Sequence, residues 1–91
     1  MSKETQNLVG GWSPFYQLTR QTQAVFEEAA EGYTGAHYAP NSVATQIVEE
    51  GTNYRFKCTA SLPLTEVIWS AIVEIFKPLH EKPYITGILR T

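Results

Sequence analysis

The residues best suited to catalysis in this chain are one cysteine and two histidines. A thiol beside an imidazole forms the nucleophile and base of many hydrolases, so Cys58 with His37 or His80 is the first arrangement to weigh. Cys58, however, lies in residues 54–60, where apolar and polar residues alternate, and it shares the apolar phase. That phase predicts a buried structural thiol. We therefore predict that the protein is not an enzyme. The alternative, a small enzyme that uses Cys58, would require a measured turnover that Cys58→Ser abolishes.

The other polar residues suggest no cofactor chemistry. Two histidines without carboxylates at ligand spacing do not predict a metal site, and no glycine-rich loop follows a strand and opens a helix. The net charge is -2, and lysine and arginine are scattered, so no basic patch is available for phosphates. We expect no cofactor and no nucleic-acid partner.

Length and composition predict one folded domain over residues 1–91. With 43% hydrophobic and 18% charged residues, the chain carries enough apolar material for a core, and residues 1–9 are expected to be a flexible lead. The start of the chain is polar and lacks an apolar stretch as long as that of a signal peptide, and no apolar segment is long enough to span a membrane. A single cysteine suits a reducing compartment. These features predict a cytoplasmic protein with no membrane partner.

A helix is expected near the start of the chain, followed only by strands. Ser13 is the expected N-cap, Pro14 the first helical residue and Gly32 the stop. The apolar stripe of this helix recurs at three- and four-residue steps and comprises Phe15, Leu18, Thr22, Val25, Phe26 and Ala29.

From residue 37 onward the pattern predicts strands. We expect them over residues 37–48, with a bulge near Pro40 and Asn41, and over residues 54–60, 67–76 and 84–89. Short connections favour antiparallel pairing, so the predicted fold class is α+β, with one α-helix packed on a four- to five-stranded antiparallel sheet.

The longest strand predicts which face of the sheet meets the helix. Its fully apolar face should pack on the helix and carries Val67, Trp69, Ala71, Val73 and Ile75. The opposite face is partly apolar, with Ile68, Ile72 and Phe76. That outer face is either a contact surface or an ordinary strand surface with a few exposed apolar side chains.

Three separated motifs give the chain its family resemblance. They are Leu8-Val9-Gly10-Gly11, then Gln46-Ile47-Val48-Glu49-Glu50-Gly51-Thr52-Asn53-Tyr54, and finally Phe76-Lys77-Pro78-Leu79-His80-Glu81-Lys82-Pro83. In order and approximate spacing they resemble the cystatins, most closely the stefins, whose hairpins carry similar motifs. The resemblance covers residues 8–89 and implies a cystatin-like fold. Thr52 and Asn53 are expected to support the first hairpin by bonding to its backbone.

The resemblance implies reversible inhibition of papain-like cysteine proteases by occlusion of their active-site cleft. By that resemblance, Leu8 and Val9 would fill non-primed subsites, and Gly10 and Gly11 would turn the chain away from the catalytic thiolate. The hairpin of Gln46, Ile47, Val48, Glu49, Glu50 and Gly51 would cover the catalytic centre. Leu79 and His80 would cover the primed side.

The first hairpin also motivates an alternative function. It has one residue more between Gln46 and Gly51 than the stefin pattern, and its tip carries Glu49 and Glu50. A cystatin-fold interaction module without protease inhibition is therefore the second hypothesis, and a simple solvated turn is the alternative for His80. We expect mainly a monomer, with exchange of the helix and first strand as the route to a dimer.

Overall fold

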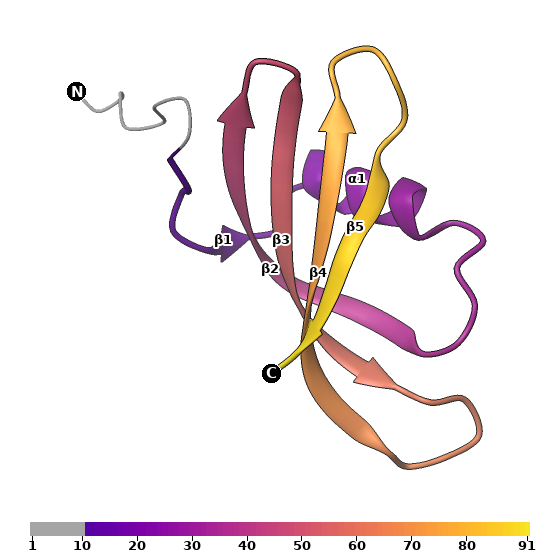
Figure 1. Cartoon of the computed structure of the whole chain (residues 1–91). Helices are drawn as coiled ribbons and strands as arrows, with labels where there is room; N and C mark the ends of the chain where they lie inside the picture. Colours follow the sequence, from indigo (N-terminus) through magenta and orange to yellow (C-terminus); the bar gives the residue numbers. More distant parts are fainter. Residues whose placement is uncertain (1–10) are drawn as a thin grey trace.

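The computed structural model describes residues 11–91, which form one helix and a five-stranded sheet (Figure 1). The elements are β1 (Tyr16–Gln17), α1 (Arg20–Ala30), β2 (His37–Val48), β3 (Gly51–Ser61), β4 (Ile68–Pro78) and β5 (Tyr84–Arg90). Each strand pairs antiparallel with the next, so the order in the sheet is the order in the chain. The predicted α+β fold class is confirmed, and it is the arrangement that the resemblance implies. The predicted flexible lead, residues 1–9, lies outside the described residues.

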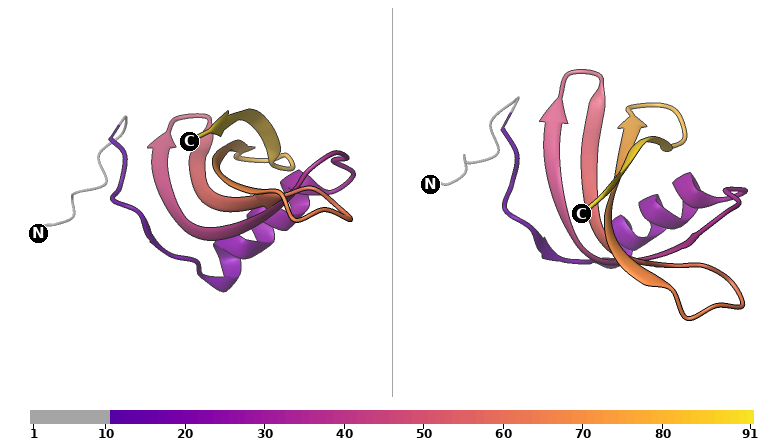
Figure 2. Two further views of the ribbon diagram at one scale, coloured as in Figure 1. Left: turned by 90° about the horizontal axis from the view of Figure 1, so that it is seen from below. Right: turned by 60° about the horizontal axis from the view of Figure 1, so that its bottom comes forward.

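The helix begins later than the sequence analysis predicts, at Arg20 and not at Pro14. Its N-cap is Thr19, whose hydroxyl accepts a hydrogen bond from the Thr22 amide, while the Thr22 hydroxyl accepts one from the Thr19 amide. This reciprocal capping box satisfies two backbone donors at once. Ser13 instead bonds to β2, because residues 12–17 run along the edge of the sheet (Figure 2).

The end of the helix agrees with the prediction to within one residue. Its last helical residue is Ala30, and Gly32 follows the Glu31 C-cap with a φ of +82°. A left-handed residue close behind a helix favours glycine, which has no Cβ to clash with the preceding carbonyl. The helix therefore stops where the glycine permits the chain to turn toward β2.

The predicted bulge in β2 is present. Pro40 pairs with Cys58 and Ser42 with Lys57, so the register shifts across Asn41. Proline cannot donate a ladder hydrogen bond, which makes an irregular position the place for it in a strand. After the shift, Val43 pairs with Phe56 and Ala44 with Arg55, and both β2 residues are buried.

The core lies between α1 and one face of the sheet. Val43, Phe56, Val73 and Ile75 are at most 1% exposed. From the helix, Phe26 places its ring edge-to-face against Phe56 with centroids 5.1 Å apart, and the Tyr54 ring stacks with that of Phe56 with centroids 5.8 Å apart. Such pairs add about 0.5–1.5 kcal/mol to the burial of the rings. The alternation in residues 54–60 thus places the aromatic residues as predicted.

One part of the predicted helix-facing surface does not meet the helix. Ala71, Val73 and Ile75 are buried, but Val67 is 48% exposed and Trp69 is half-buried. The hairpin formed by β3 and β4 extends past the helix, at the bottom of Figure 1, so the helix does not cover its far end. Trp69 there is covered in part by the Arg90 guanidinium, 5.0 Å from its ring centroid.

Candidate functional site

The two hairpins singled out by the sequence lie at the same end of the sheet. Glu49 and Glu50 form the turn between β2 and β3, and residues 79–83 connect β4 to β5. The Leu79 amide donates a hydrogen bond to the Glu50 carbonyl oxygen at 3.0 Å. Figure 1 shows both turns side by side at the top of the molecule. We call the two turns, together with Gly11 and Trp12, the hairpin edge.

Gly51 allows this close approach of the two hairpins. It is buried and pairs with Pro78 on β4. A Cβ at Gly51 would overlap the Lys77 carbonyl oxygen and lie 2.9 Å from the Pro78 Cα. Both neighbours are backbone atoms, which cannot rotate away as a side chain can. The absence of a side chain at Gly51 therefore lets the two hairpins pack closely, and the Leu79 hydrogen bond then joins them.

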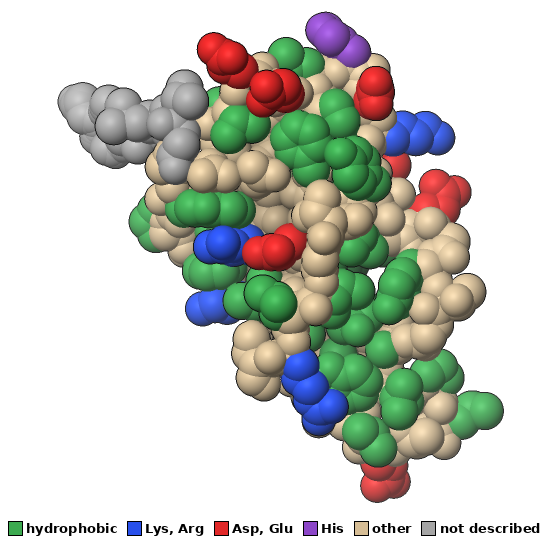
Figure 3. Space-filling model, in the orientation of Figure 1, with side chains coloured by type: hydrophobic (Ala, Val, Ile, Leu, Met, Phe, Trp, Pro, Cys, Tyr) green, Lys and Arg blue, Asp and Glu red, His purple; other side chains and the backbone are tan. Residues whose placement is uncertain are grey.

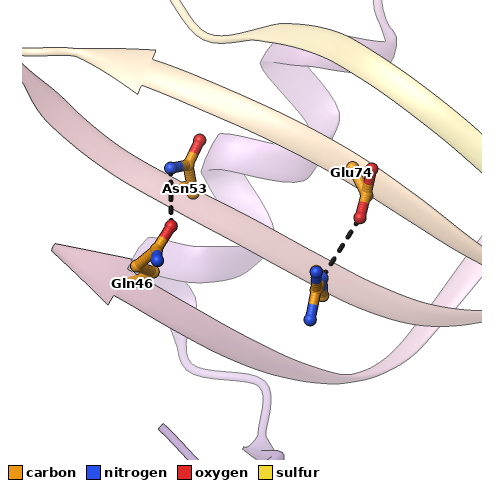
Figure 4. Close-up of polar contacts among 4 residues, drawn as sticks. Gln46, Asn53 and Glu74 are labelled. Carbon is orange, nitrogen blue, oxygen red and sulfur yellow. Dashed lines mark hydrogen bonds and ion pairs between the residues drawn. The ribbon is translucent and has the colours of Figure 1, made fainter. Parts of the chain in front are cut away.

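The legs of the first hairpin are braced by a side-chain bond across β2 and β3. Asn53 Nδ2 donates to Gln46 Oε1 at 2.9 Å (Figure 4). The prediction for Asn53 was therefore wrong in its partner: the side chain bonds to Gln46, which lies directly opposite in the register, and not to the backbone. Gln46 itself is half-buried, so its amide both braces the hairpin and borders its exposed surface.

The described start of the chain runs beside β2 at the same end. Trp12 forms a bridge with Gln46, Ser13 N donates to the Thr45 carbonyl at 2.8 Å, and Thr45 N donates to Ser13 Oγ at 3.0 Å. Gly11 is exposed and enters the sheet near the Val48 end of β2. The predicted binding residues Leu8, Val9 and Gly10 lie outside the described residues.

A row of side chains across the outer face holds the N-terminal segment in place. The Arg55 guanidinium lies 4.1 Å from the Trp12 ring centroid, and Arg55 Nε forms an ion pair with Glu74 Oε2 at 3.1 Å (Figure 4). Because the ion pair is partly exposed, its main effect is to orient the guanidinium beneath the indole. These three residues are not among the predicted binding residues; the aromatic Trp12 directly after two glycines was the available signal in the sequence.

The hairpin edge exposes both apolar and acidic side chains. Leu79 is 62% exposed and Ile47 44%, while Glu49, Glu50 and His80 are exposed and Val48 is half-buried. Figure 3 shows acidic side chains and a histidine gathered at this end of the molecule. The edge can therefore make apolar contacts through its hairpin flanks and charged contacts through the first tip.

Cys58 is confirmed as a core residue. Its side chain is 3% exposed, and Sγ lies 3.5 Å from the Phe56 carbonyl oxygen. Burial raises the pKa of the thiol from 9.0 to about 11, although a hydrogen bond from the Val73 backbone opposes the shift. A buried thiol with this pKa is protonated at neutral pH, so it is unsuited to attack a substrate. His37 pairs with Ser61, three residues along β3 from Cys58, and His80 lies in the turn after β4.

We expect this thiol to make stability fall in mild alkali. The folded pKa lies above the unfolded value, so the stabilisation is complete below pH 9 and is lost as pH rises toward 11. Between pH 8 and pH 10 the loss should be about 1.3 kcal/mol. Urea titrations of wild type and Cys58→Ala at both pH values measure it, and the variant should lack this component. Burial also raises the pKa of Tyr54, which adds its own loss above pH 10. Equal losses in the two proteins would contradict the assignment.

Residues 11–91 contain no group of three or more His, Cys, Asp or Glu side chains placed to hold a metal ion. No helix within this part of the chain has the length and apolar character needed to cross a membrane.

Comparison with protein-family models, curated proteins and solved structures found no match to this chain.

Proposed function

We propose that this protein is a reversible inhibitor of papain-like cysteine proteases that occludes their active-site cleft. The observation that carries the proposal is the hydrogen bond from Leu79 N to the Glu50 carbonyl, which joins two turns far apart in the sequence into one edge. The stefin-like motifs lie on these turns and on the segment that leads to Gly11.

Inhibition of this kind requires shape and rigidity. The Gln46 to Asn53 brace, the close packing at Gly51 and the Leu79 bond fix the hairpins before any partner binds. Preorganised loops lose little conformational entropy on binding, so more of the contact energy appears as affinity. In the proposed complex the first hairpin covers the catalytic centre, Leu79 and His80 cover the primed side, and Leu8 and Val9 occupy non-primed subsites.

Titration against active papain and a cathepsin tests the proposal. We expect dose-dependent inhibition that is recovered on dilution, with the inhibitor chain uncleaved. Leu79→Ser should weaken inhibition by about tenfold, as expected for losing one exposed leucine contact of roughly 1.4 kcal/mol. Leu64→Ser is the matched control, because Leu64 is exposed at the opposite end of the sheet. No inhibition at tens of micromolar, or equal weakening by both variants, would contradict the proposal.

A second candidate function is a cystatin-fold interaction module that does not inhibit proteases. The specific observation in its favour is the pair of exposed carboxylates at the first tip, since burying unpaired charges in an apolar cleft costs several kcal/mol. The outer face, where Ile68 is 66% exposed, would then supply the contact surface. Deletion of Glu50 separates the two: a gain of tight papain binding favours a specialised inhibitor, whereas unchanged binding to another partner favours the module.

The proposal also includes a cellular setting and an assembly state. A single buried thiol needs no oxidising compartment, which supports the cytoplasm. We propose a protein that is mainly monomeric, with exchange of α1 and β2 between copies as its route to a dimer.

A further inference from the structure

A concave site lies between α1 and the start of β2, away from the hairpin edge. Its volume is about 450 Å³, within the range of small-molecule sites. Three alanines line it, Ala30 on the helix and Ala36 and Ala39 on the loop and strand that follow. Their short side chains leave open the space that longer ones would fill. We call this cavity the α1–β2 pocket.

The floor of the α1–β2 pocket is apolar. Phe26, Val73 and Ile85 reach it from the helix, β4 and β5. Phe26 and Val73 also belong to the buried core, at 5% and 1% exposure, so the floor is fixed by packing on its far side. A bound apolar group would contact these side chains without requiring the core to rearrange.

An aromatic pair forms one wall of the pocket. Tyr33 packs edge-to-face on Tyr38, with ring centroids 5.9 Å apart, and the Tyr33 amide donates to the Ala30 carbonyl at 3.0 Å. Gly32 and Gly35 flank Tyr33 with φ values of +82° and +110°. These left-handed conformations, which suit glycine, turn the loop back so that Tyr33 lies over the pocket. The loop is the segment between α1 and β2 in Figure 1.

The charge on the rim selects the ligand. Glu27 lies on α1 and Glu31 is the C-cap of the helix, and both line the pocket. Gln23 Nε2 donates a hydrogen bond to Glu27 Oε2 at 3.2 Å. His37 is the remaining titratable rim group besides the tyrosines, and no lysine or arginine lines the pocket. Two carboxylates and the faces of tyrosine rings both attract a cation. We propose that the α1–β2 pocket binds a small amphipathic cation, an amine attached to an apolar ring or chain.

In the proposed complex the apolar part of the ligand rests on Phe26 and Ile85, and its ammonium group lies between the carboxylates and the tyrosine wall. This site is independent of the hairpin edge, because the pocket is at the opposite end of β2 from the Glu49 turn. Its occupation does not require protease inhibition to be correct.

Titration of the full chain with 4-phenylbutylamine, followed by amide NMR, tests the proposal. We expect saturable shifts confined to residues 23–40 and their core neighbours, with 4-phenylbutyrate, of opposite charge, binding at least about tenfold more weakly. The variant with both Glu27→Gln and Glu31→Gln should weaken amine binding by about tenfold. Glu28→Gln is the matched control, because Glu28 is exposed on the same helix but does not line the pocket.

The proposal is overturned if the amine gives no saturable shifts at millimolar concentration, if the carboxylate binds as well as the amine, or if Glu28→Gln weakens binding as much as the double variant. The glutamine variants change exposed side chains and should fold, which the spectrum without ligand verifies. A further variant, Ala36→Leu, should reduce binding by filling the space, and undiminished binding there would place the ligand elsewhere.

Discussion

Phe56→Ala is expected to lower the free energy of unfolding by about 4 kcal/mol, within the range for removing a buried phenylalanine. Phe56 is 0% exposed and contacts the rings of both Phe26 and Tyr54. The variant therefore loses the transfer energy of the ring, two aromatic contacts and the packing around the cavity left behind. Since a domain of this size has only about 5–10 kcal/mol of stability, chemical denaturation should show a large shift of the midpoint.

Phe15→Ala is the matched control for this prediction. Phe15 is 37% exposed on the sheet's outer side, where the Lys57 ammonium lies 4.3 Å from its ring centroid. Its removal should cost less than about 1 kcal/mol. Similar losses for the two phenylalanines would show that the core is not centred on Phe56.

Gly51→Ala should cost about 3 kcal/mol, with the damage concentrated at the hairpin edge. The added methyl group meets backbone atoms of Lys77 and Pro78, so relief requires β3 and β4 to separate where the hairpins join. We expect the Leu79 amide to lose its protection from hydrogen exchange, because its bond to Glu50 spans this junction. The proposed protease inhibition should weaken by more than the loss of global stability alone explains.

Gly87→Ala provides the comparison for Gly51. A Cβ at Gly87 would lie 3.1 Å from Glu74 Oε1, the far end of a side chain, which can give by a few tenths of an ångström where backbone atoms cannot. The free energy of unfolding should therefore change by less than about 0.5 kcal/mol, and Leu79 should stay protected. If Gly51→Ala is as mild as this control, the hairpins are not joined as tightly as the packing indicates.

Local patterning was sufficient to predict most of the sheet. The alternation in residues 54–60 decides which side chains face the core, because successive side chains on a strand point to opposite faces. Pro40 similarly identifies the bulge in β2, since its backbone lacks a donor whatever the surroundings. Both features follow from properties of single residues and their immediate neighbours, which can be read from the sequence.

The start of the helix was not predictable in the same way. Ser13-Pro14 and Thr19 both suit a helix N-terminus, and local preference does not decide between them. Which of the two begins the helix depends on β2, whose Gln46 pairs with Trp12 and whose Thr45 bonds to Ser13, 32 residues earlier in the chain. Pairing with a distant strand holds residues 12–17 extended and leaves Thr19 as the cap.

The sequence alone determined the α+β class, the order of the helix and the four strands after it, the burial of Cys58 and the two turns of the hairpin edge, because these follow from periodicity and from residues with restricted backbones. It did not predict β1, which lies within the segment expected to be helical. Only the tertiary structure decided that Leu79 bonds to Glu50, that Arg55 lies beneath Trp12 and that three alanines leave a pocket beside α1. Each of these contacts joins residues far apart in the chain. Their geometry depends on the twist and register of the whole sheet, which no local pattern contains.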